Sequence, residues 1–446
     1  MNEENTTLEK VNSWIKNSVT LKLITITILI LLLLIPTSMI TSIIQEREDL
    51  NNQASNEVSS KWANKQLING PILSIPLLYE QKKGEDIVEW SKLLQILPEQ
   101  LLINGKIDPE KLKRGIYEIV VYKSYLSFSG NFILDQKIDQ ANLKEIKWDQ
   151  AFLTIGISDL RGIEDELLVK WNNQSLKVQP GSNIPEIIYS GITVNLPNME
   201  TLQDKSVAFQ FDLKLQGSQN MSFIPVGSET KIELDSSWPS PSFNGAFLPD
   251  HRDVRNDGFS ASWKVLQLNR NFPQTWIGSS NGDKLNQSAF GVDLILPLDD
   301  YQKSMRSAKY AVMTIALTFL IFFLVEIINR RKIHPFQYTL VGLSLCLFYV
   351  LLVSISEHSN FNLAYLISTG AIVTMITFYS QSIFKERKFT MLLVATLIGI
   401  YGFLFITLQL ADYALLMGSI GLTLIMSATM YFTRNINWYR LNIQSD

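Results

Sequence analysis

Residues 310–328 read YAVMTIALTFLIFFLVEII and are followed by NRRK at residues 329–332. This stretch carries one charge, Glu326, and is long enough to cross a hydrocarbon core of about 30 Å as a helix. Short basic loops stay on the cytoplasmic side of a membrane, so the cations at 330–332 predict a helix that runs from outside to inside. The chain is therefore expected to have an exported region before this helix and a membrane bundle after it.

A second apolar run covers residues 23–44, LITITILILLLLIPTSMITSII. A cleaved signal peptide is the competing interpretation, but the run continues past Pro36 and no small-residue cleavage pattern follows it. It is therefore interpreted as an uncleaved first membrane helix. Lys22 precedes it and Glu46 follows it, which places the N-terminus inside. Residues 1–22 are expected to form a cytoplasmic amphipathic tail, with a frayed basic tail as the alternative.

Four more apolar segments follow, at residues 338–356, 361–384, 389–410 and 413–432. Lys and Arg are absent from the two loops expected outside and present in every loop expected inside, an alternation that soluble core helices would not show. Residues 309–433 are thus predicted to be a five-helix bundle, followed by a cytoplasmic tail at 434–446. The count is six transmembrane helices, one plus five, with both termini inside.

The region between the first two membrane helices, residues 45–308, changes its hydrophobic period. Residues 45–66 are expected to continue the first helix outward as a stalk. Residues 207–215 (VAFQFDLKL) alternate apolar and polar strictly, as a half-buried strand does, and a turn at 216–220 predicts a hairpin with 221–226. The other strand signals fall at residues 72–79, 115–133, 152–158, 167–171, 192–196, 231–234, 260–268 and 289–296. The predicted fold class is an α+β membrane protein whose large β-rich periplasmic domain is an antiparallel sandwich or a curved sheet.

Composition narrows the functional classes. The net charge of the 446 residues is −3, which does not suggest a nucleic-acid partner. The one cysteine, Cys346, lies in an apolar run, so the exported domain has no disulfide and must be stabilised by its core. The sequence contains no H-E-x-x-H, C-x-x-C, G-x-S-x-G or P-loop motif, and no catalytic residue, cofactor or metal site is predicted.

Residues 236–250, SSWPSPSFNGAFLPD, are the least strand-like part of the exported domain. Prolines deny donors to a sheet, and Gly245 permits unusual backbone torsions. Trp238, Phe243 and Phe247 are interleaved with them. One interpretation is a rigid aromatic loop that contacts a partner; the other is an ordered loop that inserts its aromatic rings into the domain core.

Ionisable groups at membrane depth are the other candidates. Glu357 and His358 sit at a predicted outer loop, and Asp412 is predicted on the same surface. These three residues are either a proton or cation site at the mouth of the bundle or a hydrated loop. Glu326 is interpreted as the partner of Arg330, four residues later on the same helix.

Several stretches together resemble the CreD family of bacterial inner-membrane proteins. They are LLLLIPTSMITSIIQERED (31–49), GPILSIP (70–76), ISDLRGI (157–163), SSWPSPSFNGAFLPD (236–250), AKYAVMTIALTFLIFFLVEI (308–327), HPFQYTLVGLSLCLFYVLLVSISEH (334–358) and FTRNINWY (432–439). The resemblance covers nearly the whole chain in order. It implies an inner-membrane protein with a large periplasmic domain, tied to cell-envelope integrity and to the Cre two-component regulon, without established catalytic residues or a cofactor.

Two functional hypotheses follow. In the first, the protein is a non-enzymatic envelope-maintenance and stress-response protein whose periplasmic domain binds an envelope protein or a cell-wall component, while the bundle anchors or transduces. In the second, it is a transporter or lipid-handling protein, with Glu357, His358 and Asp412 at the mouth of a pathway through the bundle. A membrane-bound hydrolase of cell-wall material is a third interpretation, supported only by scattered acidic residues.

Overall fold

The computed structural model describes residues 19–434, except 84, 135–140, 173, 198, 203–205, 297–299, 330–332 and 411–413. The chain divides into two compact units. The β unit is Asn51–Pro297, and the helical unit combines the residues before 51 with those after 297. The expected N-terminal tail up to residue 18, the cations at 330–332 and all but the first residue of the C-terminal tail lie outside the described residues.

The first helix, α2, runs without interruption from Val19 to Trp62 and contains Pro36. Its sequence changes character along its length. The first half is apolar, and the stretch after Gln45 is polar and acidic. One stripe of the apolar half, with members one or two helical turns apart, is buried within the helical unit. Its members are Ile26, Leu33, Ile40 and Ile44.

Six further helices complete the helical unit as described. They are α4 (Asp300–Lys309), α5 (Ala311–Asn329), α6 (Pro335–Ser356), α7 (Phe361–Phe384), α8 (Arg387–Gln409) and α9 (Ala414–Thr433). Their ends follow local chemistry. Pro335 opens α6 at a position where its missing N–H costs nothing. The Asn360 side chain accepts a hydrogen bond from Leu363 N at the start of α7, and Lys385 ends that helix in the left-handed conformation.

Five helices within the described part of the chain are long and apolar enough to cross a membrane. They are Thr20–Trp62, Gln302–Ile327, Pro335–Ser356, Phe361–Phe384 and Arg387–Gln409. Close packing between them needs small residues. An added Cβ at Gly342 would lie 2.2 Å from Leu33 Cδ1 and 2.9 Å from Phe319 Cζ, so this glycine lets α2 and α5 approach α6 closely. The protein is thus a mixed α+β protein with several membrane-spanning candidates.

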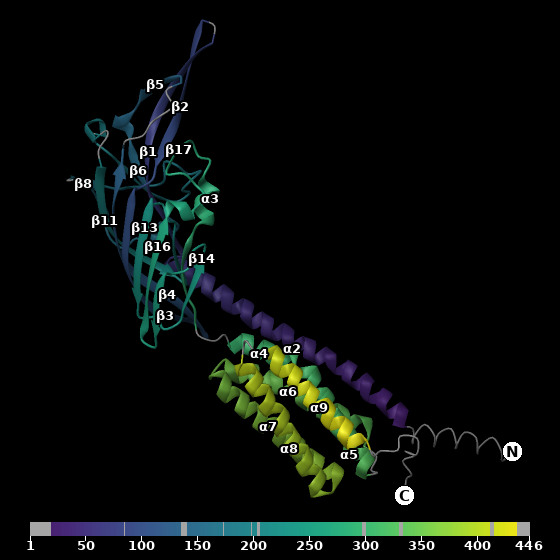
Figure 1. Ribbon diagram of the computed structural model, residues 1–446. Helices are drawn as coiled ribbons and strands as arrows, with labels where there is room; N and C mark the ends of the chain where they lie inside the picture. Colours follow the sequence, from purple (N-terminus) through teal and green to yellow (C-terminus); the bar gives the residue numbers. More distant parts are fainter. Residues whose placement is uncertain are drawn as a thin grey trace, which may run out of the picture. The chain divides into compact units, whose positions relative to one another are not determined.

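The β unit contains two sheets, of ten and eight described strands, and a short helix α3 (Gly282–Gln287) (Figure 1). The ten-stranded sheet comprises β1 (Gln66–Lys83), β2 (Asp86–Ile96), β5 (Leu143–Ile146), β6 (Phe152–Ile157), β9 (Gln179–Pro180), β10 (Gly191–Asn195), β12 (Asn220–Phe223), β14 (Pro241–Gly245), β17 (Thr275–Ile277) and β18 (Phe290–Leu294). The eight-stranded sheet comprises β3 (Gln100–Arg114), β4 (Tyr117–Ile133), β7 (Leu168–Trp171), β8 (Gln174–Lys177), β11 (Ser206–Ser218), β13 (Glu229–Ser236), β15 (His251–Arg255) and β16 (Gly258–Leu266).

Most strand pairs are antiparallel; β1–β12 and β3–β13 are parallel. The longest ladder joins β3 to β4, from Gln100 opposite Asn131 to Arg114 opposite Tyr117. β11 buries every second residue, as its alternating sequence predicts. One hydrophobic cluster takes side chains from both sheets and is their shared core. The β-rich prediction is confirmed.

The predicted hairpin between residues 207–215 and 221–226 is wrong. β11 pairs with β4 and β7, whereas β12 pairs with β1 and β18 in the other sheet. Gln219, between them, has φ of 61°. Its N–H donates to Val120 O, so the chain turns from one sheet into the other instead of folding back on itself. The segment expected to be irregular, residues 236–250, also contains a strand, β14, which pairs with β18.

Candidate functional site

The C-terminal end of α2 is held by an aspartate and an arginine of the β unit. Asp159 caps the short 3₁₀ turn Leu160–Gly162, and its carboxylate accepts hydrogen bonds from Arg161 Nε at 2.9 Å and Arg161 Nη2 at 2.6 Å. Arg161 Nη1 donates to Ser60 O, one of the carbonyls that the last turn of a helix leaves without a partner. Asp159 Oδ2 accepts from Asn64 N at 2.9 Å, just past the helix. We call Asp159 and Arg161 the α2 clamp.

The buried side-chain amide of Gln66 holds the backbone of the clamp residue Asp159. Gln66 is fully buried; its Nε2 donates to Asp159 O at 3.0 Å and to Gln216 O at 2.8 Å. Its Oε1 accepts from Asp159 N at 3.2 Å. An added Cβ at Gly162 would lie 2.3 Å from Gln216 O, so only glycine fits there without displacing backbone. The ISDLRGI stretch therefore folds tightly around the end of α2.

Charge strengthens the clamp. The Arg161 guanidinium, which hydrogen-bonds to the carboxylate, lowers the pKa of Asp159 to about 2, against the opposing effect of burial. Backbone donors from Asn64 and Arg161 itself act in the same direction as the guanidinium. Asp159 is therefore ionised at neutral pH and holds both the arginine and the first residues beyond α2.

The side of α2 that faces the β unit is held at further points. Arg114 Nη2 lies 2.8 Å from Glu57 Oε1 in an exposed ion pair. Trp62 Nε1 donates to Tyr122 O at 3.4 Å. Burial raises the pKa of Tyr122 well above its ordinary value, and its hydroxyl donates to Asn220 O at 2.7 Å. The exposed pair adds little, because solvent screens it, so the clamp, whose carboxylate is buried, is the stronger attachment.

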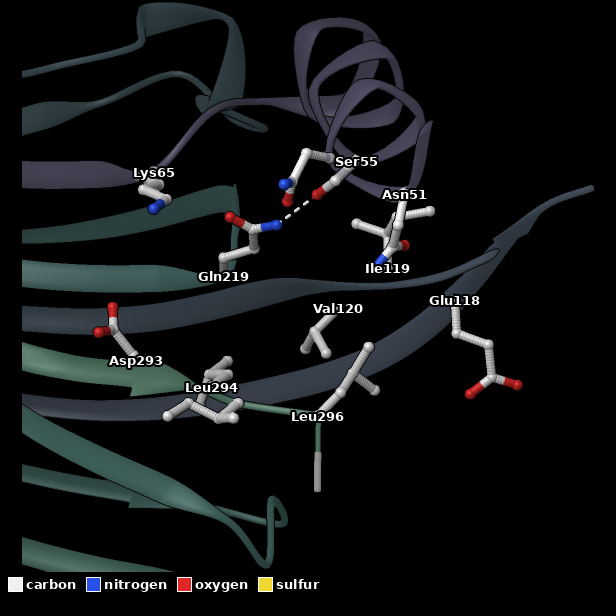
Figure 2. A pocket seen from close by; sticks show the side chains of 12 residues that line it. Asn51, Ser55, Lys65, Glu118, Ile119, Val120, Gln219, Asp293, Leu294 and Leu296 are labelled. Atoms are coloured by element: carbon white, nitrogen blue, oxygen red, sulfur yellow. Dashed lines mark hydrogen bonds between the residues drawn. The ribbon is translucent and has the colours of Figure 1, made fainter. Parts of the chain in front are cut away.

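A cavity of about 250 Å³ lies beside this attachment (Figure 2). α2 and both sheets contribute to its lining, which consists of Asn51, Asn52, Ser55, Lys65, Glu118, Ile119, Val120, Gln219, Asp293, Leu294, Ile295 and Leu296. The Gln219 amide donates to Ser55 Oγ across the cavity, the interaction drawn as a dashed line. One part of the lining is apolar and the other offers amides and charges, the mixture typical of small-molecule sites.

The charged side chains that line the cavity differ in whether they already have partners in the protein. Asp293 Oδ1 accepts from Asn220 Nδ2 at 2.7 Å, and Oδ2 accepts from Asn244 Nδ2, so its carboxylate is already hydrogen-bonded. Lys65 is exposed and has no carboxylate within ion-pair distance in the described chain. The Lys111 ammonium lowers the pKa of Glu118 by hydrogen bonding to its carboxylate. Lys65 is the charged group best placed to meet a ligand.

The three aromatic residues of the 236–250 segment pack inward to different degrees. Trp238 is buried, and its Nε1 donates to Ile295 O at 2.9 Å. Phe243 is partly buried and meets Phe259 and Trp263 edge-on at centroid distances of 5.7 Å. Phe247, also partly buried, meets the ring of Phe290 at 5.6 Å. Gly245 has φ of 92°, the unusual torsion expected of it. These contacts are those of the core alternative; a partner-binding role remains a prediction.

The residues predicted to form an outer-mouth group, Glu357, His358 and Asp412, do not form one described cluster. Glu357 Oε1 lies 3.3 Å from Arg47 Nε of α2. The His358 ring Nδ1 lies 3.2 Å from Ser354 O of its own helix. Asp412 lies outside the described residues. Among those that are described, Glu357 and His358 are not joined by a hydrogen bond or an ion pair.

The sequence interpretation missed the partners of Glu326. This residue is buried in the helical unit, where it forms an ion pair with Lys22 of α2. Its carboxylate also accepts from Ile333 N at 2.8 Å and from Tyr338 Oη at 3.0 Å. Arg330, its expected partner, lies outside the described residues. The helical spacing suggested a local pair, but the described contacts of Glu326 come from two other helices, α2 and α6, and from the loop after its own.

Comparisons with known proteins agree with this architecture. Residues 18–439 match the model of the family described as "Inner membrane protein CreD". A curated relative, "Inner membrane protein CreD" of Escherichia coli (strain K12), is 33% identical over 420 residues, which cover 93% of this chain and 92% of the relative. Neither description names a reaction. With its apolar helices and its large β unit, the chain belongs to the CreD family of inner membrane proteins.

Proposed function

We propose that this protein supports cell-envelope integrity as a non-enzymatic sensor, in which the β unit binds an envelope component and α2 carries the signal to the membrane bundle. The observation that carries the proposal is the continuity of α2 from Val19 to Trp62. A single helix supplies the first membrane span, lines the cavity through Ser55, and ends at the α2 clamp.

The topology we propose has six membrane helices, with α9 as the sixth. Its twenty residues, ALLMGSIGLTLIMSATMYFT, contain no charge and match the thickness of a hydrocarbon core. Basic residues at 330–332 and 385–388, and their absence from the intervening outer loops, support cytoplasmic termini and a periplasmic β unit.

Reporter fusions test this topology. Fusions after residues 45 and 300 are expected to report the periplasm, and fusions after residues 332, 388 and 440 the cytoplasm. A cytoplasmic signal from a fusion at residue 200 would reject the arrangement, because the whole β unit would then lie on the wrong side.

A helix is a suitable transmitter because its backbone hydrogen bonds make it stiff along its axis. A ligand in the cavity would touch both α2, at Ser55, and the strand residue Asp293. Binding can shift the position of α2 only if it favours one position over another, and a cavity shared by the helix and the sheets permits such a difference.

The transmission step can be tested by breaking the helix between the units. A five-residue glycine–serine insertion after Leu50, where the two units divide, should abolish envelope protection while the protein reaches normal membrane levels. The matched control is the same insertion after Gly115, in the exposed β3–β4 turn, where an added Cβ would meet nothing within 4 Å. Detergent and antibiotic sensitivity of cells that lack the native gene gives the readout. Full protection by the Leu50 insertion would show that α2 does not transmit.

A further inference from the structure

A second cavity of the β unit, of about 320 Å³, lies on the ten-stranded sheet and shares no lining residue with the cavity beside α2. Strand β2 contributes Ser91, Leu93 and Gln95 to its lining. Alternate residues of a strand point to the same face, so these three side chains form one surface. The turn at residues 183–187 lines the cavity as well. We call this cavity the β2 pocket.

The turn that lines the β2 pocket is held firmly. Ile187 N donates to Ile184 O at 2.9 Å, and Ile184 N donates to Ser182 Oγ at 3.1 Å. An added Cβ at Gly282, the first residue of α3, would lie 2.7 Å from Glu186 O, so this helix packs directly against the turn. The β2 pocket is therefore formed before any ligand arrives, as small-molecule sites usually are.

Gln95 brings an unused hydrogen-bond donor to the β2 pocket. The residue is only 1% exposed. Its Oε1 accepts from Ser74 Oγ at 2.7 Å, but its Nε2 has no hydrogen-bond partner in the part of the chain that the structure describes. A buried amide donor without a partner is destabilising and uncommon. Because Gln95 lines the pocket, a ligand oxygen there can accept from this donor.

Apolar side chains lie beside that donor. Leu93, two residues before Gln95 on the same face of β2, is partly buried against the core. Ile184 and Ile187 of the turn are each 4% exposed and also line the pocket. A donor amide next to apolar side chains fits a carbonyl oxygen that has a methyl group attached to the same carbon. An acetamido group has this structure.

The rest of the lining is polar and exposed. Asn183 and Ser279 offer an amide and a hydroxyl, each of which can donate and accept. The two charged residues, Lys92 and Glu186, are exposed and opposite in sign. Such a rim matches an uncharged ligand that carries several hydroxyl groups.

We propose that the β2 pocket binds an N-acetylated amino sugar. The acetamido carbonyl accepts from Gln95 Nε2, its methyl group packs against Leu93 and Ile184, and the ring hydroxyls meet the polar rim. Cell-wall glycans contain sugars of this kind, so the site would give the β unit an envelope component to bind. The binding itself does not depend on signalling through α2, which the insertion after Leu50 tests separately.

The test uses the purified full-length protein in a detergent without a sugar headgroup. Saturation-transfer NMR measures the binding of N-acetylglucosamine and of glucose, which has a hydroxyl in place of the acetamido group. Transfer to N-acetylglucosamine is expected to be strongest at the acetyl methyl protons. Glucose should bind at least about tenfold more weakly, because a site built to hydrogen-bond one ligand group discriminates against an analogue that lacks it.

Two variants locate the site. Gln95→Met keeps a side chain of similar length but removes the donor, and it should weaken the binding of N-acetylglucosamine about tenfold. Ser91→Phe places a ring in the pocket from an exposed position and should abolish binding. The matched control is Ser175→Phe, at an exposed serine of β8, and it should bind as the unaltered protein does.

Three results would overturn the proposal. The first is no binding of N-acetylglucosamine by the unaltered protein, and the second is equal binding of the two sugars. The third is undiminished binding of N-acetylglucosamine by either variant in its folded form. If Gln95→Met does not fold, Ser91→Phe decides, since its side chain starts from the surface and leaves the Gln95–Ser74 hydrogen bond in place.

Discussion

Replacing Asp159 by asparagine should loosen the attachment of α2 to the β unit. The substitution keeps the size of the side chain and removes its charge. Arg161 donates to both carboxylate oxygens of Asp159. In the variant, only the amide oxygen of asparagine could accept from it, and that oxygen carries no charge. The asparagine NH2 group would replace one carboxylate oxygen, and it donates instead of accepting. At least one of the hydrogen bonds from Asn64 N and from the Arg161 guanidinium should therefore break.

The magnitude follows from the pKa. Folding lowers the pKa of Asp159 from 3.8 to about 2, which corresponds to about 2 kcal/mol of stability at neutral pH. Because the folded pKa is the lower one, this contribution is complete above pH 3.8. It declines as the pH falls toward 2, where the folded carboxylate also becomes protonated. The Asp159 side chain is 9% exposed, but its partner Arg161 is 56% exposed, so solvent screening lowers the contribution below this value.

The assay is thermal unfolding of the purified protein, in which the β-sheet circular dichroism signal is recorded as the temperature rises. At pH 7, Asp159→Asn should melt about 5 °C lower, since about 1 kcal/mol shifts the melting temperature of a domain of this size by 2–4 °C. The gap should narrow as the pH falls from 4 to 2. Asp165→Asn is the control, because Asp165 is exposed and pairs only with exposed Lys214 among the described residues. An unchanged melting temperature at pH 7, or a gap that does not depend on pH, would refute the assigned role.

Three other perturbations test the rest of the structure. Glu326→Ala should destabilise the helical unit by about 3–5 kcal/mol, because it removes a buried carboxylate that pairs with Lys22 and accepts from Ile333 N and Tyr338 Oη; the measurement is thermal unfolding in detergent, with Glu326→Gln expected to lose less. Gly245→Val should lower the melting temperature of the β unit, since the residue has φ of 92° and an added Cβ would lie 2.3 Å from Ala289 O. Phe243→Ala should cost about 3–5 kcal/mol if the ring belongs to the core, whereas normal melting with lost envelope protection would support the partner-contact hypothesis.

The membrane helices could be found from the sequence because their signal is local. A run of some twenty apolar residues must be a helix wherever it lies in the fold, and its ends are marked by charge. Helix α4 was missed for the opposite reason. DYQKSMRSAK is polar, and nothing within it reveals that Lys303 is buried.

The strands were predicted where the sequence alternates or is continuously apolar. β11 reads VAFQFDLKL and was recognised, whereas β3, QLLINGKIDPEKLKR, contains Pro109 and several lysines and was not. β3 is a strand because β4 pairs with it along its whole length. The hairpin error has a similar origin: a turn-like sequence shows that the chain bends, but not which sheet the next strand joins.

The α2 clamp illustrates what the sequence cannot provide. ISDLRGI stood out as a stretch shared with the family, yet its residues act on Ser60 and Asn64, almost a hundred positions earlier. The same holds for Lys22 and Glu326, which lie in different helices. A pairing at such a separation depends on the completed fold and leaves no periodic pattern.

Through these long-range contacts, α2 is attached within both units of the protein. Within the helical unit it is held by ion pairs at Lys22 and Arg47, and within the β unit by the hydrogen bond from Arg161 to Ser60. Between Arg47 and Ser60 the helix is continuous, as the proposed function requires of a transmitter. The cavity opens along this stretch, at Ser55. In the proposed function, a ligand bound there would meet the same helix that carries the Lys22 and Arg47 ion pairs; a passive anchor would need no such site on the helix.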